Sequence, residues 1–272
     1  MRANSLSIFA IALATSGSAF AGLTVDGNLA DWKIDKTTWV SSLPNVHSTI
    51  EDSTGSGAYY LSPGYGGQAY DAEALYATIQ GDKLFIALAT GHNPLTVDKP
   101  SANIYAAGDF AIDFGKNGSY DLGINVVNNF NGGLLGGVYS SPTWAYGLWS
   151  NTGTQTSDPT KVDKTHPTSL LGGTLLGSSA YSYTTVGASG WGSKTSDLHY
   201  FYEVSLDLSL LHLAGWDGSE FNIQWTENCA NDSILVDPGH AVPEPGSLAL
   251  AFVGMAGLTG IRRHRKSAVA KP

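Results

Sequence analysis

Oxygen-bearing side chains gather at two places in this sequence, at spacings that suit a calcium ion. Asp26, Asn28 and Asp31 lie within six residues, and Asp109 and Asp113 are four apart, on one face of an expected strand. Ca²⁺ binds about six to eight oxygens, so these are candidate ligands of a structural ion. Neither group has the spacing of an EF-hand loop. Alternatively, Asp26 and Asn28 stabilise a turn, and Asp109 and Asp113 cap strand ends.

Carboxylates near the end of the chain offer a second kind of chemistry. Glu203, Asp207 and Glu227 lie on or beside expected strands, and two such groups can hydrolyse a glycosidic bond. Their spacing does not require such a pair. The seven histidines lack a His-Glu-x-x-His motif, and there is no Gly-x-Ser-x-Gly motif or phosphate loop. The sequence predicts a protein that is not an enzyme, with a glycan-active enzyme as the alternative.

The stretch 225–232 adds more oxygens after the last expected strand. Glu227, Asn231 and Asp232 are able to join a cation site. The simpler interpretation is that this stretch closes the final strand of the domain.

Aromatic residues point to sugar binding. Tryptophan and tyrosine rings stack on the apolar faces of sugars while amides and carboxylates bond the hydroxyls. The candidate ligand-binding residues in the middle of the chain are Trp144, Tyr146, Trp149 and Trp191. A second group in the glycine-rich segment 55–70 is Tyr59, Tyr60, Tyr65 and Tyr70. The alternative for each ring is a place in the hydrophobic core.

The charge of the body limits its partners. Between the predicted signals at the two ends lie 220 residues with eight lysines, no arginine and 22 carboxylates, a formal charge near −14. Nucleic acid is excluded as a partner because phosphate binding needs clustered cations. Divalent cations or neutral glycans fit an acidic surface, which also favours solubility. The single cysteine, Cys229, excludes an intramolecular disulfide.

Short alternating segments must position these residues. Residues 75–89 predict a hairpin with a tight Gly-Asp turn, and residues 109–126 predict a second strand pair. Further strands are expected at 198–204 and 221–225, with a helical turn within 206–213. The pattern predicts a mainly β protein, an antiparallel β-sandwich of the jelly-roll kind.

The region 132–192 has a different composition. It is rich in glycine, serine, threonine and asparagine, with tryptophan and tyrosine residues set among them. This composition predicts long loops and edge strands.

The first 21 residues resemble a secretory signal. A charge at Arg2 precedes an apolar run at 6–14, and Ala19 and Ala21 fit the small-x-small cleavage rule. The sequence predicts a signal helix over residues 1–21, removal by signal peptidase, and a mature chain that begins at Gly22.

The end of the chain combines three features in a fixed order. Val242, Pro243, Glu244 and Pro245 precede an apolar run at 246–261. The run is about 24 Å long as a helix, slightly short of a bilayer core. The basic cluster over residues 262–266 that follows contains Arg262, Arg263, Arg265 and Lys266. The sequence predicts a single transmembrane helix with its basic end in the cytoplasm, and three parts: signal 1–21, sandwich domain 22–241 and tail 242–272.

The order of these tail features strongly resembles the PEP-CTERM sorting domain. In that family an exosortase, a membrane-embedded cysteine protease, recognises the tail. The resemblance implies an exported protein that is held transiently at the membrane, cut near Pro243–Pro245, and passed to the cell surface or the extracellular space.

The start of the mature chain shows a weaker resemblance. Residues 23–32, with an Asp-Gly turn and a following Asp31-Trp32 pair, together with the hairpin at 75–89, resemble family 9 carbohydrate-binding modules and DOMON-like sandwiches. The resemblance covers residues 23–126. It implies a sandwich fold, and no sugar-binding residue can be transferred from it.

These observations predict an exported cell-surface or extracellular-matrix protein with a non-catalytic β-sandwich that binds extracellular polysaccharide and holds Ca²⁺. One alternative is a purely structural biofilm or surface protein without a small ligand. The other is a secreted glycan-active enzyme.

Overall fold

The computed structural model describes residues 22–52, 65–127 and 132–239. Within these ranges the protein is built from two antiparallel sheets, as expected for a β-sandwich. The helices predicted at the two ends lie outside the described residues.

The first sheet has five strands in the order β1-β2-β3-β9-β8. Its strands are β1 (His47–Ile50), β2 (Ala72–Gln80), β3 (Lys83–Thr90), β8 (Ala180–Tyr183) and β9 (Tyr200–Asp207). The second sheet has six strands in the order β11-β10-β4-β5-β6-β7. Its strands are β4 (Phe110–Phe114), β5 (Leu122–Ile124), β6 (Gly137–Tyr146), β7 (Pro167–Ser178), β10 (Phe221–Thr226) and β11 (Ser233–Val236). Short helices connect some of them: η1 (Gln68–Tyr70), η2 (Pro100–Ala102) and α1 (Leu208–Leu213).

Both predicted strand pairs are confirmed. Strands β2 and β3 pair from Ala72 to Gln80, and Gly81 turns the chain with a φ of 62°, which costs a residue without Cβ little. Strand β4 pairs with β5, and β4 also pairs with β10. The short helix predicted before Gly215 is α1.

The middle of the chain holds more strand than its composition predicted. Region 132–192 contains β6, β7 and β8, and β7 spans twelve residues. Strands β7 and β8 lie at sheet edges, as expected, but β6 is internal to its sheet. The polar composition of β7 is tolerated because its second half is partly exposed at a sheet edge.

The main core lies between the two sheets. From β3, Leu84, Ile86 and Leu88 enter this core, where they join Phe110 of β4 and Trp225 of β10. These residues are buried almost completely. The period of two along β3 is that of a strand whose alternate side chains face opposite sides of the sheet.

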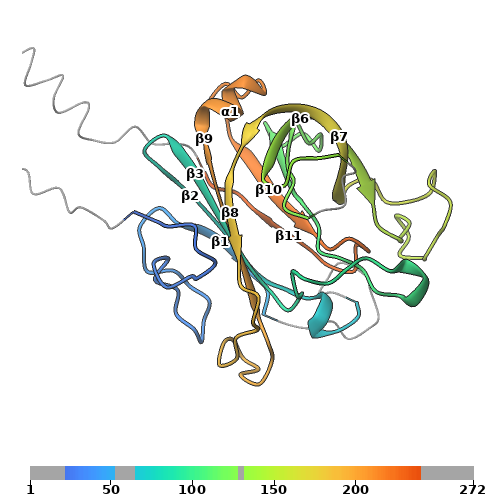
Figure 1. Ribbon diagram of the computed structural model, residues 1–272, viewed down its shortest axis with the longest axis horizontal. Coiled ribbons are helices and arrows are strands. Elements are labelled where there is room, and N and C mark those ends of the chain that lie inside the picture. Colours follow the sequence, from blue (N-terminus) through green and yellow to red (C-terminus); the bar gives the residue numbers. More distant parts are fainter. Residues whose placement is uncertain (1–21, 53–64, 128–131, 240–272) are drawn as a thin grey trace, which may run out of the picture.

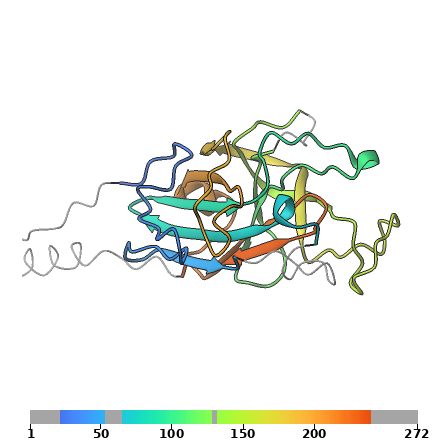
Figure 2. The same cartoon turned by 90° about the horizontal axis from the view of Figure 1, so that it is seen from below.

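The other face of the five-stranded sheet is also buried. Phe85 and Ala87, the intervening residues of β3, pack against Trp32 and Trp39 of the N-terminal segment 22–46. Trp32 is 1% exposed. This segment makes the five-stranded sheet a central layer, which Figures 1 and 2 show in two views.

Strand register defines the two ends of this sheet. Thr90 of β3 pairs with Tyr200 of β9 at one end, and Lys83 pairs with Asp207 at the other. Helix α1 follows Asp207 and lies at the top of Figure 1. The turn η1 and the segment 184–199 lie at the opposite end of the sheet.

Candidate functional site

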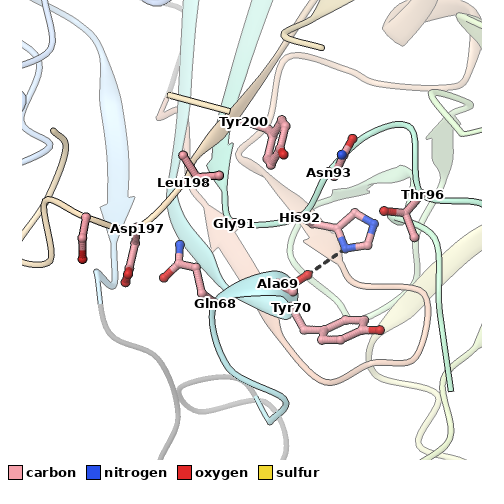
Figure 3. Close-up of a pocket in the computed structure, with 11 residues that line it drawn as sticks. Gln68, Ala69, Tyr70, Gly91, His92, Asn93, Thr96, Asp197, Leu198 and Tyr200 are labelled. Atoms are coloured by element: carbon pink, nitrogen blue, oxygen red, sulfur yellow. Dashed lines mark hydrogen bonds between the residues drawn. The ribbon is translucent and has the colours of Figure 1, made fainter. Parts of the chain in front are cut away.

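A groove of about 410 Å³ opens at the end of the five-stranded sheet where β3 finishes and β9 begins. Three segments line it: the η1 turn, residues 91–96 after β3, and residues 196–200 before β9. Figure 3 shows how these segments surround the groove. The side chains that matter for its chemistry are Gln68, Tyr70, Asn93, Thr96, Asp197 and Tyr200.

Close backbone contacts hold the η1 turn against the strand end. A Cβ at Gly91 would lie 1.7 Å from the carbonyl oxygen of Gln68, so only glycine fits there. The carbonyl of Asp71 accepts hydrogen bonds from the Gly91 N–H at 2.9 Å and from the Thr90 hydroxyl at 2.5 Å. The wall made by η1 is therefore fixed by the fold.

His92 is a buried lining residue of the groove and is neutral near pH 7. Its Nδ1 lies 3.0 Å from the carbonyl oxygen of Ala69, so Nδ1 carries the proton and donates it. Burial lowers the pKa of His92 to about 4. The same Nδ1 is 3.3 Å from Glu227, whose pKa is raised well above its ordinary value by burial and by the nearby Asp232. Burial therefore disfavours the charged form of both side chains at this contact.

Two tyrosines and two neutral amide side chains line the groove together. Tyr70 and Tyr200 are half-buried, and so are Gln68 and Asn93, which supply amide groups. Such a lining suits a neutral ligand that is rich in hydroxyls, because sugar C–H faces stack on rings while amides bond the hydroxyls. Asp197 is the one carboxylate among the described residues that line the groove, whereas glycoside hydrolysis uses a pair.

A second concavity lies in the middle of the chain. It measures about 600 Å³ and is lined by residues 150–162. The described lining residues are hydroxyl, amide and aliphatic side chains with Lys161, and none is aromatic. It therefore lacks the stacking surface that the first groove has.

The three tryptophans predicted to bind sugar are buried. Trp144, Trp149 and Trp191 are only 7–8% exposed. Trp191 stacks on Trp39 at 5.0 Å between ring centroids, and Trp149 donates from Nε1 to Asn231 at 3.0 Å. Trp144 packs in a cluster with Tyr139 and Leu170, so all three tryptophan rings contact the protein itself.

The tyrosine candidates are distributed differently. Tyr146 is half-buried at the end of β6, away from the groove. Tyr70 lines the groove, and Tyr65 is exposed with its ring edge against Trp149. Tyr59 and Tyr60 lie outside the described residues.

The predicted calcium ligands near the N-terminus are engaged in turns. Asp26 accepts from the N–H of Asn28 at 2.8 Å, and Asn28 accepts from the N–H of Ala30 at 3.0 Å. Asp31 accepts from the N–H of Thr24 at 2.7 Å. These bonds are the ones that the turn interpretation requires.

The second predicted pair also bonds the backbone. Asp109 accepts from the N–H groups of Val126, Val127 and Leu170 at 2.8–3.0 Å. Burial raises the pKa of Asp109 to about 7 against these bonds, which lower it. Asp113 accepts from two N–H groups of the following turn. In the described part of the chain, no three His, Cys, Asp or Glu side chains are placed to hold a metal ion by themselves, so calcium at these residues stays a prediction.

Glu203 organises the N-terminal turn. One of its carboxylate oxygens accepts three backbone N–H groups at 2.6–3.0 Å, from Asp26, Gly27 and Asn28. The other accepts from the indole N–H of Trp32 at 2.7 Å. Burial raises the pKa of Glu203, and these hydrogen bonds oppose that shift.

The other two carboxylates considered for catalysis lie elsewhere. Asp207 forms a surface ion pair with Lys83 at the α1 end of the sheet. Glu227 is buried beyond β10 beside His92. The three carboxylates thus have three separate surroundings, and the described structure does not combine them into a pair.

Sequence reasoning missed most of the groove. Gln68, Asn93 and Tyr200 belong to segments that are far apart in the chain and meet only through the pairing of β2, β3 and β9. The available signal was weak: polar residues directly follow a strong strand at 91–93.

The burial of Cys229 is now established. It is a free thiol in the interior, and burial raises its pKa above the ordinary value. It is therefore unreactive in the folded protein.

The end of the chain matches a known family. Residues 241–266 match the PEP-CTERM protein-sorting motif, which confirms the resemblance seen in the sequence. No curated protein and no solved structure matches the chain. The resemblance of residues 23–126 to family 9 modules therefore stays a prediction.

The predicted processing residues cannot be placed in the fold. Ala19 and Ala21 at one end lie outside the described residues, and so do the tail residues Val242, Pro243, Glu244, Pro245, Arg262, Arg263, Arg265 and Lys266. Within the described ranges, no helix has the length and apolar character needed to span a bilayer. The match alone carries the assignment: the chain bears a PEP-CTERM sorting motif, which marks an exported surface protein for exosortase processing at the membrane.

Proposed function

We propose that this chain is an exported, non-catalytic surface protein whose β-sandwich binds a neutral extracellular polysaccharide in the groove between β3 and β9. The observation that carries the proposal is the lining of the groove. Two half-buried tyrosines and two half-buried amide side chains line a space of about 410 Å³. The sorting motif supports the location, because it directs the protein to the surface.

The charge of the protein selects among polysaccharides. The body carries a formal charge near −14, and the described lining of the groove contains Asp197 and no lysine or arginine. An anionic polymer would meet like charge, which weakens association. A neutral glycan avoids this repulsion and keeps the stacking contacts.

Retention on polysaccharide gels tests this site. We expect the full chain in mild detergent to be retarded in native gels that contain a neutral glycan. Tyr200→Leu should reduce the apparent affinity about tenfold, since one lost ring contact costs roughly 1–2 kcal/mol. Tyr146→Leu is the matched control, because Tyr146 is also half-buried but lies on the other sheet.

Three results would reject the proposal. Equal retention of wild type and Tyr200→Leu would exclude the groove. Loss of retention only in Tyr146→Leu would favour the middle region. Free migration on every glycan, with assembly into the surface layer after export, would support the purely structural alternative.

Intact mass tests the processing of the chain. We expect the protein recovered from its host to begin at Gly22 and to end within residues 243–246, as signal peptidase and exosortase cleavage require. The measurement is mass spectrometry of the membrane and secreted fractions. Recovery only of chains that still end at Pro272 would mean that the tail is a permanent anchor.

A further inference from the structure

A small acidic cavity lies next to the groove. Its volume is about 10 Å³, enough for one water-sized sphere. Gln68 and Asp197 line both the cavity and the groove. The remaining ionisable groups that line the cavity are Asp52, Asp71, Glu73, Lys194 and His199.

Asp71 is buried in this cavity without a hydrogen-bond partner. The residue is 1% exposed, and neither carboxylate oxygen has a partner among the described residues. Its main chain is held by the Thr90 hydroxyl and the Gly91 N–H, so the side chain is fixed beside the cavity. A buried polar group without a partner costs about 1–3 kcal/mol.

Two of the neighbouring carboxylates, Glu73 and Asp52, have partners. Glu73 accepts from the side chains of Gln68 at 2.7 Å and His199 at 2.9 Å. Asp52 accepts from the N–H of Ser193 at 2.9 Å. Asp197 also lines the cavity but is half-exposed, so Asp71 is the fully buried lining carboxylate left without a hydrogen-bond partner among the described residues.

Several elements bring carboxyl groups close to Asp71. Glu51 and Asp52 follow β1, Glu73 lies on β2, and Asp232 precedes β11, where it accepts from the N–H of Ala72 at 2.6 Å. Burial first, and these neighbours second, raise the pKa of Asp71 to about 8 and that of Glu51 to about 7. Burial and nearby carboxylates likewise raise the pKa of Asp232 to about 8.

The described residues supply little positive charge to balance these groups. Among the described residues that line the cavity, Lys194 is the one lysine or arginine. Its ammonium group lowers the pKa of Asp71 and so opposes part of the rise. His199 already bonds Glu73. A cation would relieve the repulsion among the carboxylates directly.

We propose that this cavity binds a calcium ion, with both carboxylate oxygens of Asp71 as ligands. Oxygen predominates in the lining, and Ca²⁺ accepts amide, hydroxyl and water oxygens in an irregular shell. Those oxygens must complete the shell, because the described residues contain no three His, Cys, Asp or Glu side chains placed to hold a metal alone. The amide of Gln68 and the hydroxyl of Ser193 line the same cavity. This site does not depend on polysaccharide binding.

Calorimetric titration of CaCl₂ into the metal-free full chain in detergent tests the site. We expect one ion per chain near pH 8, and a lower affinity near pH 6 because protons compete for the carboxylates. Asp71→Asn should weaken binding at least about tenfold. Lys194→Met should strengthen it, because the competing ammonium is lost. Asp217→Asn is the control, an exposed turn carboxylate that should leave affinity unchanged.

The substitution to asparagine is chosen so that a loss of binding is not caused by misfolding. Asparagine has the shape of a protonated aspartate, so Asp71→Asn should keep the circular dichroism spectrum of the wild type. Absence of binding in the wild type, or equal affinity in a folded Asp71→Asn, would overturn the proposal. Equal affinity for Mg²⁺ would overturn the assignment to calcium, because Mg²⁺ demands a regular octahedral shell.

Discussion

Glu203 and Asp71 are both buried carboxylates of the five-stranded sheet, each about 1% exposed. Glu203, within β9, receives four hydrogen bonds from the N-terminal turn and Trp32. Asp71, directly before β2, receives none from the described residues. The two side chains are thus equally buried, but one accepts four hydrogen bonds and the other accepts none from the described residues.

The difference separates structural carboxylates from those that are ready for a ligand. The four donors to Glu203 stabilise its negative charge and attach the segment 22–46 to the outer face of the sheet. Nothing comparable stabilises a charged Asp71, so it keeps its proton to about pH 8. A buried carboxylate whose oxygens accept several hydrogen bonds, such as Glu203, stabilises the fold. A buried carboxylate without donors, such as Asp71, is where we propose that a cation binds.

Removal of Glu203 should have the largest effect on stability. Glu203→Ala leaves buried N–H donors of the turn and of Trp32 without an acceptor, and we expect a loss of about 3 kcal/mol in the free energy of unfolding. Urea denaturation measures this loss. Asp207→Ala, on the same strand, removes only a surface ion pair and should cost about 0.5 kcal/mol.

The comparison fails if Glu203→Ala and Asp207→Ala lower the free energy of unfolding by similar amounts. A loss below about 1 kcal/mol for Glu203→Ala would show that water replaces the carboxylate at the turn. The role of Glu203 in holding the N-terminal segment would then be rejected.

A smaller effect, of opposite sign, is expected for Asp71→Asn in the presence of a calcium chelator. The carboxyl ionises near pH 3.8 in the unfolded chain and near pH 8 in the folded protein. Between these values the folded state binds more protons, so the free energy of unfolding falls as pH rises. Asparagine removes this contribution, and the variant should be more stable than the wild type by about 1 kcal/mol at pH 8.

Thermal unfolding between pH 4 and pH 8 measures the change. The gain should shrink toward pH 4, because the folded state already holds the proton there and the unfolded chain begins to take it up. Asp109→Asn is the matched control, because Asp109 is equally buried but bonds three backbone N–H groups, so its variant should lose stability. A pH-independent difference between Asp71→Asn and wild type would contradict the raised pKa.

The strands of the sandwich were largely predictable. The alternating segments 75–89 and 109–126 form β2 to β5, because side chains on opposite faces of a strand produce a period of two. Edge strands were expected in region 132–192, but the position and length of β7 were not, since its serines, threonines and glycines carry no such pattern. Pairing with β6 stabilises it, and only the fold brings β6 into place.

The roles of the aromatic residues could not be predicted. Trp144 and Trp191 stand among polar residues, as exposed rings would. Trp144 is buried among side chains of the neighbouring strands β4, β6 and β7, and Trp191 is buried against Trp39 of the N-terminal segment. A ring that stacks on sugar and a ring that closes a core have the same local sequence, because the covering segment lies elsewhere in the chain.

The sequence by itself determined the sorting signal of this protein and its mainly β class. A sorting motif is recognised as a short linear segment, and strand alternation is a local property, so neither needs long-range contacts. Only the tertiary structure decided which carboxylates have partners and where the groove lies. The partners of Glu203 are more than 170 residues away, and the walls of the groove meet through β3 and β9. Burial and charge depend on neighbours in space, which only the folded chain defines.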